Sequence, residues 1–219
     1  MSTPSVMQSQ PQSLDKRMSL KSVFWPIFIE QLLVMSLMMV DIIMLTQYAD
    51  EAVAAVGLTG QILLLLVLMF MIVSTGSGIL IGQNLGANRS DIAHQYAHAG
   101  VALAVLFAGL IGVIFYFGIA PAIQMYGLAP MVEAYAIDYA VVVGSLSIGL
   151  ALTLMFSTIL RTHGHSRAPM RIQIVGGLIN LLGNYVALFG PFGLPIFGVT
   201  GVAVATVTSQ CVMAVLGAY

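Results

Sequence analysis

The stretch PIFIEQLLVMSLMMVDIIMLTQ, from Pro26 to Gln47, decides the fold of this chain. As a helix rising about 1.5 Å per residue, it is long enough to cross the hydrocarbon core of a bilayer. It carries two acidic residues, Glu30 and Asp41. A carboxylate inside the hydrocarbon region costs at least about 2.5 kcal/mol and usually faces a bundle interior or a water-filled path. We therefore predict that Asp41 has a functional role. The alternative is that it only forms a structural hydrogen bond between helices.

The composition of the whole chain points to the same environment. Of its 219 residues, 59% are hydrophobic and 7% are charged, whereas soluble domains average about 45–50% and about 25%. Long apolar runs recur throughout, without the alternating pattern of barrel strands. The fold class we predict is an all-α, polytopic membrane protein.

Six membrane spans follow from the apolar runs, and a polar tail precedes them. Residues 1–21 are rich in Ser, Gln and Pro, too polar to fold alone, and are predicted to form a disordered cytoplasmic tail rather than a signal peptide. Residues 22–219 are predicted to form one six-helix transmembrane lobe. Its spans are expected at about 23–47, 53–82, 92–119, 132–160, 170–189 and 199–219.

The basic residues predict the orientation of these spans. All seven lie in the tail, in the second loop or around the fourth loop (Lys16, Arg17, Lys21, Arg89, Arg161, Arg167 and Arg171). Because Lys and Arg gather in cytoplasmic loops, the N-terminus is expected in the cytoplasm and the protein in the cell membrane.

Polar residues from three spans are predicted to lie at similar depth. Counting from the outer helix ends, Asp41, Asn184 and Thr206 come out about 8 to 11 Å inside the bilayer. Asn180 precedes Asn184 by one helical turn and shares its face.

These four side chains suit a small cation. A carboxylate, two amide carbonyls and a hydroxyl offer the oxygen ligands that a hard cation prefers. The same pocket could instead hold a proton on Asp41, since burial disfavours the charged form of a carboxyl group. The remaining alternative is that Asn and Thr only hydrogen-bond between helices.

Two further residues of the first span are candidates for a cavity or a hinge. Glu30 precedes Asp41 by eleven residues, which at 100° per residue returns it to nearly the same face. It could line the cavity or snorkel to the cytoplasmic surface. Pro26 could be a first-turn proline or a hinge.

Three stretches of the chain resemble the N-terminal half of the multidrug and toxic compound extrusion (MATE) transporters. The first is the opening span with Asp41, a short loop and AVAAVGL (52–58). The second is IGQNLGANRSDIAHQYAHAG (81–100). The third is LRTHGHSRAPMRI (160–172), leading into LINLLGNYVALFG (178–190) and GVTGVAVATVTSQ (198–210).

This resemblance implies a lobe of a two-lobe, twelve-helix antiporter that exports cationic or amphipathic compounds in exchange for Na⁺ or H⁺. By similarity Asp41 would be the coupling acid, with Asn180, Asn184 and Thr206 completing the cation pocket. Some family members carry aspartate where Asn184 stands, so this chain has one negative charge fewer. The length of 219 residues supplies one lobe, which implies a fragment or a half-transporter that dimerises.

Other functions fit the residues less well. A lipid-linked oligosaccharide flippase of the same superfamily is expected to line its cavity with Arg and Lys, and no basic residue is predicted inside a span. An intramembrane hydrolase built on Ser77 would need a membrane-embedded histidine as base, and all four histidines fall in or beside loops predicted to be cytoplasmic.

The partners that the sequence predicts are the lipid bilayer, small organic cations and a second lobe, with no nucleic acid. His94 and His98 have the spacing of metal ligands but no evident third ligand. We therefore expect no cofactor, and no metal besides a possible Na⁺ at the cation site.

Overall fold

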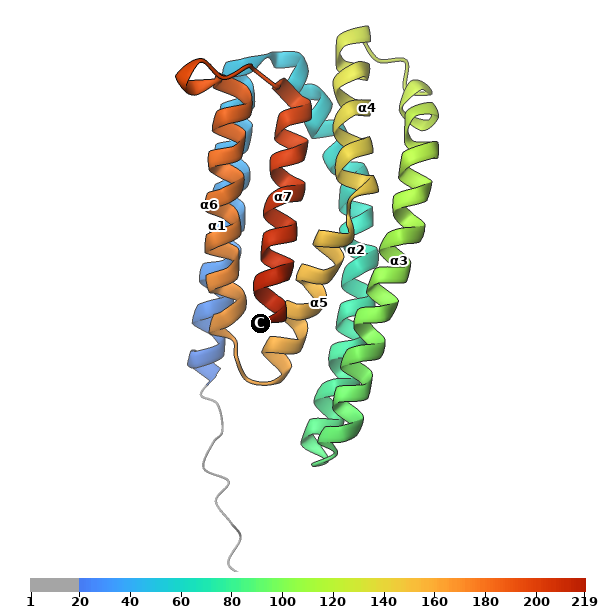
Figure 1. The fold of residues 1–219 in the computed structure, drawn as a ribbon, viewed down its shortest axis with the longest axis vertical. Helices are drawn as coiled ribbons and strands as arrows, with labels where there is room; N and C mark the ends of the chain where they lie inside the picture. The colour runs from blue at the N-terminus through green and yellow to red at the C-terminus, as the bar shows by residue number, and fades with distance from the viewer. Residues whose placement is uncertain (1–19) are drawn as a thin grey trace, which may run out of the picture.

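The computed structural model describes residues 20–219, which are almost entirely helical (Figure 1). The elements are α1 (Leu20–Tyr48), α2 (Asp50–Gly86), α3 (Ser90–Gln124), α4 (Pro130–Ser145), α5 (Ile148–Thr162), α6 (Arg167–Phe189), the short 3₁₀ helix η1 (Pro191–Gly193) and α7 (Gly198–Ala218). The predicted tail lies outside the described residues, apart from residues 20 and 21, which begin α1.

One predicted span differs from the structure. Residues 132–160 were expected to form a single helix, but the chain forms α4 and α5 with a 48° bend between them. The bend follows Gly144 and Ser145, and sharp helix kinks are typical of such Gly/Ser pairs. By length and composition, five of the described helices can each cross a membrane, and the bent pair can form a sixth span.

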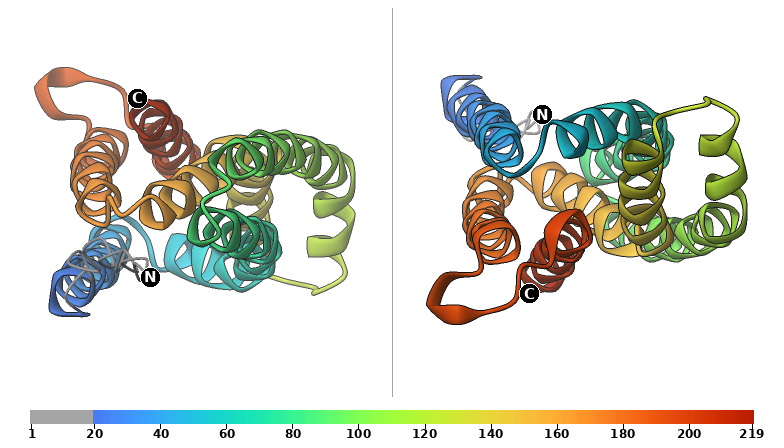
Figure 2. Two further views of the ribbon diagram at one scale, coloured as in Figure 1. Left: turned by 90° about the horizontal axis from the view of Figure 1, so that it is seen from below. Right: turned by 90° about the horizontal axis from the view of Figure 1, so that it is seen from above.

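Two groups of helices make up the bundle, and α5 joins them. On one side α6 packs against both α1 and α7, and on the other α3 packs against both α2 and α4. Figure 2, which views the bundle along its length, shows α5 near the middle, where it contacts α7, α2 and α3. A buried cluster including Leu66, Phe70, Ile81 and Met155 fills the space between α2, α3 and α5.

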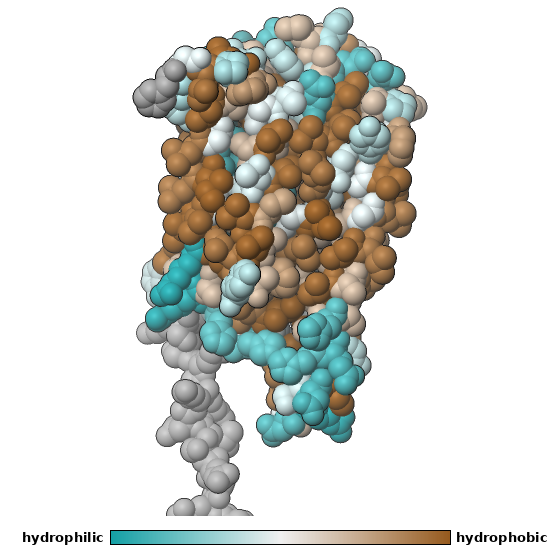
Figure 3. Space-filling view, viewed as in Figure 1, coloured by the Kyte–Doolittle hydropathy of each residue, from teal (hydrophilic) through white to brown (hydrophobic). Residues whose placement is uncertain are grey.

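The outer surface of the bundle is apolar, as expected of helices in contact with lipid. Large hydrophobic side chains such as Ile72, Leu106 and Phe117 are more than 70% exposed. Figure 3 shows apolar residues covering most of one face, with hydrophilic residues gathered at the end where α2 meets α3.

The loops alternate between the two ends of the bundle (Figure 1). The α2–α3 and α5–α6 turns lie at the same end as the start of α1; the first turn carries Arg89, and Arg167 begins α6 directly after the second. The α2–α3 turn is closed by Asn88 in the left-handed region (φ 58°), with Arg89 N–H donating to the Asn84 carbonyl (2.9 Å). The described basic side chains therefore share one end of the molecule.

Close helix approach at the α4–α5 bend gives a first prediction. A Cβ added to Gly112 of α3 would lie 2.6 Å from the carbonyl oxygen of Ser145, a backbone atom that cannot swing away. We expect Gly112→Ala to destabilise the protein by about 1–3 kcal/mol. Thermal unfolding in detergent measures the effect.

Gly109→Ala, one turn earlier on α3, is the matched control, because nothing lies within 4 Å of its added Cβ. Equal stability of the two variants would contradict the packing described for this bend.

Candidate cation site

Close packing of α1 on α6 positions Asp41. Gly177 of α6 is buried directly beneath the Leu37 side chain of α1, and a Cβ there would clash with the Leu37 Cδ1 atom. Asp41 follows Leu37 by one turn, and Asn184 follows Gly177 by two turns, so both lie on the faces that meet. The small residue thus lets the two helices approach until the polar side chains touch.

A chain of hydrogen bonds runs from Asp41 across three helices. The Asn184 amide donates to Asp41 Oδ1 (2.8 Å) and to Asn180 Oδ1 (3.2 Å). The Asn180 amide in turn donates to the Thr206 hydroxyl of α7 (3.2 Å), which donates to the Val202 carbonyl (3.0 Å). Asp41, Asn184 and Thr206, which were predicted to lie at similar depth, therefore form one connected network together with Asn180, and we call it the polar network.

A fourth helix also reaches the polar network. Tyr139 of α4 lies near the Thr206 hydroxyl. Its ring packs against Val143, Ala203 and Val207. Tyr139 thus closes the network on the α4 side.

One buried oxygen of the polar network, Asn184 Oδ1, has no hydrogen-bond partner among the described residues. Asn184 is only 1% exposed, yet no donor among the described residues reaches its Oδ1 atom. A buried carbonyl oxygen without a hydrogen bond is unfavourable, and a cation or a proton donor beside it removes that penalty. With Asp41 adjacent, the donor set consists of oxygens and suits Na⁺ or a protonated carboxyl group.

Glu30 and Pro26 lie outside the polar network. Glu30 forms an ion pair with Arg161 of α5 (2.5 Å), so it neither joins Asp41 nor snorkels freely. Pro26 is buried within α1, which already begins at Leu20, and the first-turn interpretation is therefore wrong. A proline at this point removes one hydrogen bond from the helix interior.

Tyr139 and Arg161 were not predicted from the sequence as site residues. Tyr139 stands in an apolar run, where a tyrosine usually fills a core, and depth alone does not tell which way its helix is rotated. Arg161 belongs to the last turn of α5 and was assigned to a loop. The signal that could have found it is a single acid, Glu30, at the same end of the bundle.

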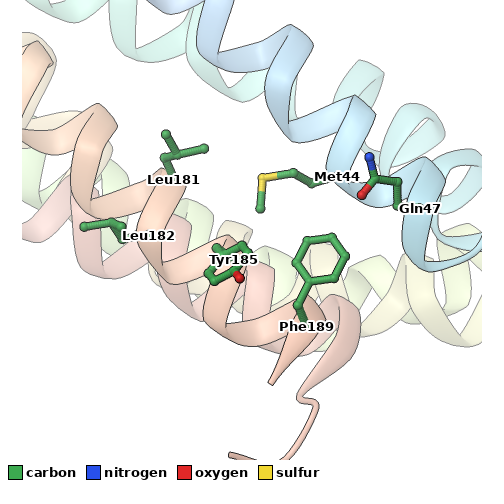
Figure 4. A pocket seen from close by; sticks show the side chains of 6 residues that line it. All are labelled: Met44, Gln47, Leu181, Leu182, Tyr185 and Phe189. Atoms are coloured by element: carbon green, nitrogen blue, oxygen red, sulfur yellow. The ribbon is translucent and has the colours of Figure 1, made fainter. Parts of the chain in front are cut away.

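A pocket of about 600 Å³ lies between α1 and α6 immediately beyond the polar network (Figure 4). Met44 and Gln47 face it from α1, and Leu181, Leu182, Tyr185 and Phe189 face it from α6. Met44 is one turn past Asp41, and Tyr185 is next to Asn184. The pocket is thus apolar and aromatic apart from Gln47 and the Tyr185 hydroxyl, and Asp41 and Asn184 do not line it.

Within residues 20–219, no three His, Cys, Asp or Glu side chains gather in a way that could hold a metal ion. His94 instead lies near His163, with ring centroids 6.0 Å apart.

Comparison with known proteins finds transporters and multidrug resistance proteins among the relatives of this chain. Residues 26–186 match the MatE family. The chain is 37% identical over 192 residues to an uncharacterized transporter, YisQ, of Bacillus subtilis, covering 88% of the chain and 42% of the relative. It is 30% identical over 183 residues to a probable multidrug resistance protein, NorM, of Thermotoga maritima, covering 84% and 39%.

The fold is also shared with solved structures. A transporter of the MOP superfamily from Pyrococcus furiosus aligns with a TM-score of 0.79 at 23% identity, covering 90% of this chain and 43% of that one. A structure described as MATE in complex with MaL6 aligns with a TM-score of 0.84 at 22% identity over the same shares. The chain spans about two fifths of the length of the curated relatives it matches.

The polar network predicts a measurable coupling between Asp41 and Asn184. Asn184→Ala removes the amide that donates to the carboxylate, and we expect a loss of about 1.5–3 kcal/mol in thermal stability. In an Asp41→Asn background, Asn184→Ala should lower the free energy of unfolding by clearly less, because the carboxylate that accepted the hydrogen bond from Asn184 is absent.

Leu182→Ala, at an exposed position of α6, is the control and should show no such dependence on Asp41. Additive effects of Asp41→Asn and Asn184→Ala would contradict a direct interaction between the two side chains.

Proposed function

The chain belongs to the MATE family of membrane transporters, and from this we propose that it is one lobe of a cation-coupled exporter of cationic or amphipathic compounds. Members of the family are transporters and not enzymes, and this chain is a multi-pass membrane protein. In the proposed mechanism Asp41 is the coupling acid, and Asn180, Asn184 and Thr206 complete the site for the inward-moving cation.

The observation that carries this proposal is the carboxylate of Asp41 beside the unpartnered Oδ1 of Asn184. If α1 and α6 needed only a hydrogen bond to hold them together, a neutral amide or hydroxyl would suffice. It would avoid the unfavourable free energy of placing a charge in the membrane. A charge with an adjacent free acceptor instead favours reversible binding of a cation or a proton.

Two coupling ions fit this site. Na⁺ would be held by the Asp41 carboxylate and the Asn184 carbonyl, with Thr206 and Asn180 as further oxygens. Alternatively, a proton would be bound by the Asp41 carboxyl group, whose O–H could then donate a hydrogen bond to Asn184 Oδ1. The absence of a second acid at position 184 lowers the charge available for Na⁺, so both ions enter the test.

The chemistry of the site also indicates the class of exported compound. A negative group attracts organic cations, whereas the pyrophosphate of a lipid-linked oligosaccharide would need basic residues at this depth. The pocket lined by Met44, Tyr185 and Phe189 would accept the apolar part of such a compound, since Met and aromatic side chains adapt to varied shapes and attract cations.

We further propose that the lobe works with a second six-helix lobe and lies in the cell membrane with the start of α1 in the cytoplasm. Support for the second lobe comes from the relatives, of which the chain covers about two fifths. Support for the orientation comes from Arg89, Arg161, Arg167 and Arg171, which lie at the end where α1 begins.

The decisive experiment replaces Asp41 in the complete two-lobe transporter. We expect Asp41→Asn to abolish cation-driven export of an ethidium-like dye from vesicles, while membrane insertion is retained. The reason is that a neutral amide cannot take up a proton and supplies no negative charge to hold Na⁺. Replacing Na⁺ by K⁺ at fixed pH, and imposing a pH gradient without Na⁺, identifies the coupling ion.

Asp138→Asn is the matched control, since Asp138 is an exposed acid of α4 that accepts a hydrogen bond from Thr200 outside the polar network (3.3 Å). Its export should stay close to that of the unchanged protein. Undiminished export by Asp41→Asn would refute the proposed mechanism.

A further inference from the structure

The ion pair between Glu30 and Arg161 joins two helices that otherwise hardly touch. Arg161, in the last turn of α5, donates through its terminal guanidinium nitrogen to Glu30 Oε1 of α1 (2.5 Å). Among the residues that the structure describes, no other salt bridge occurs. The helix that α1 packs against is chiefly α6, and its contacts with α5 are very few.

The pair is shielded from solvent but incompletely satisfied. The Glu30 side chain is 13% exposed and that of Arg161 36% exposed. Within the described chain neither Glu30 Oε2 nor Arg161 Nε has a hydrogen-bond partner, so a single bond joins groups that could form two. A permanent ion pair would be more stable with two hydrogen bonds between the guanidinium and the carboxylate. A pair joined by a single hydrogen bond is weaker and therefore suits a contact that forms and breaks.

The Glu30–Arg161 pair lies at a position where a movement of α1 would change the distance between its two side chains. Glu30 follows Pro26 by one helical turn, and the proline removes a backbone hydrogen bond from this part of α1. Asp41 follows Glu30 by eleven positions of uninterrupted helix, and both lie on nearly the same face. A tilt or rotation of α1 that accompanies cation binding at Asp41 would therefore displace Glu30 relative to α5.

We propose that Glu30 and Arg161 form a clasp that closes the N-terminal side of the lobe, and that this clasp must open for the transporter to expose its cavity on that side. Both are positioning residues: they touch neither the cation nor the exported compound. This inference rests on the proposed function, because a clasp that opens presumes alternating access. It assigns the pair a role distinct from the polar network around Asp41.

Cysteine accessibility tests the clasp directly. Cys211, the single cysteine of these 219 residues, and any cysteine of the second lobe are first replaced by serine. Ser157→Cys then places a probe one turn from Arg161 on the same face of α5. A membrane-impermeant maleimide is applied to the N-terminal side of vesicles containing the two-lobe transporter. We expect Glu30→Gln to speed labelling roughly fivefold or more, the range of a typical conformational coupling.

Three further variants separate a pair that opens from a structural contact. The charge-swapped protein, Glu30→Arg with Arg161→Glu, should restore slow labelling, and Arg161→Lys should label close to the unchanged protein. Ser90→Cys, at the exposed first residue of α3, is the reference and should label equally in all backgrounds.

Unchanged labelling in Glu30→Gln would overturn the proposal, as would a swapped protein that labels as fast as Glu30→Gln. If Glu30→Gln does not accumulate in the membrane, the swapped and Arg161→Lys proteins decide the matter by the same criterion. Because labelling requires no exported compound, a failure here leaves the Asp41 experiment unaffected, and normal export by Asp41→Asn would leave the labelling result standing.

Discussion

The hydrogen bond from Asn184 to Asp41 is the constraint on which the arrangement of α1 and α6 depends. It joins the two helices inside the bilayer, where an unpaired carboxylate is expensive. The bond forms only because Gly177 lets α1 approach, and it extends through Asn180 to Thr206, which ties α7 to the same point. One set of side chains thus joins three helices, and in the account proposed here a cation or proton bound at Asp41 would affect all three.

In the proposed transport cycle, α1 is therefore the part of the lobe that we expect to move. The opposite half of the bundle is held by an apolar core between α2, α3 and α5. In contrast, α1 is attached through α6, through its turn into α2, and through two polar contacts, one near each end. In the account proposed here, the Asp41–Asn184 contact responds to binding of the cation. The Glu30–Arg161 contact then opens or closes the N-terminal side of the lobe. The interrupted hydrogen bonding at Pro26 lies on the far side of the Glu30–Arg161 contact.

Much of the fold and of the site could be predicted because bilayer thickness turns sequence position into depth. The family and the all-helical class followed from the apolar runs and quoted motifs. Asp41, Asn184 and Thr206 could be grouped because their distances from helix ends agree, and Asn180 because it shares the face of Asn184. Depth does not reveal helix rotation or neighbours, and so Tyr139 and the Glu30–Arg161 pair were missed. The α4–α5 bend was missed because the apolar run continues across it, and hydropathy does not register the Gly144–Ser145 kink.

The most direct test of the central claim is to observe the Asp41 carboxyl group itself. Infrared difference spectra of the two-lobe transporter in lipid, recorded with and without the coupling ion, report changes in carboxyl stretching vibrations. The account predicts an ion-dependent carboxyl signal that disappears in Asp41→Asn and persists in Asp138→Asn. An identical difference spectrum in Asp41→Asn would show that the ion binds elsewhere and would contradict the account.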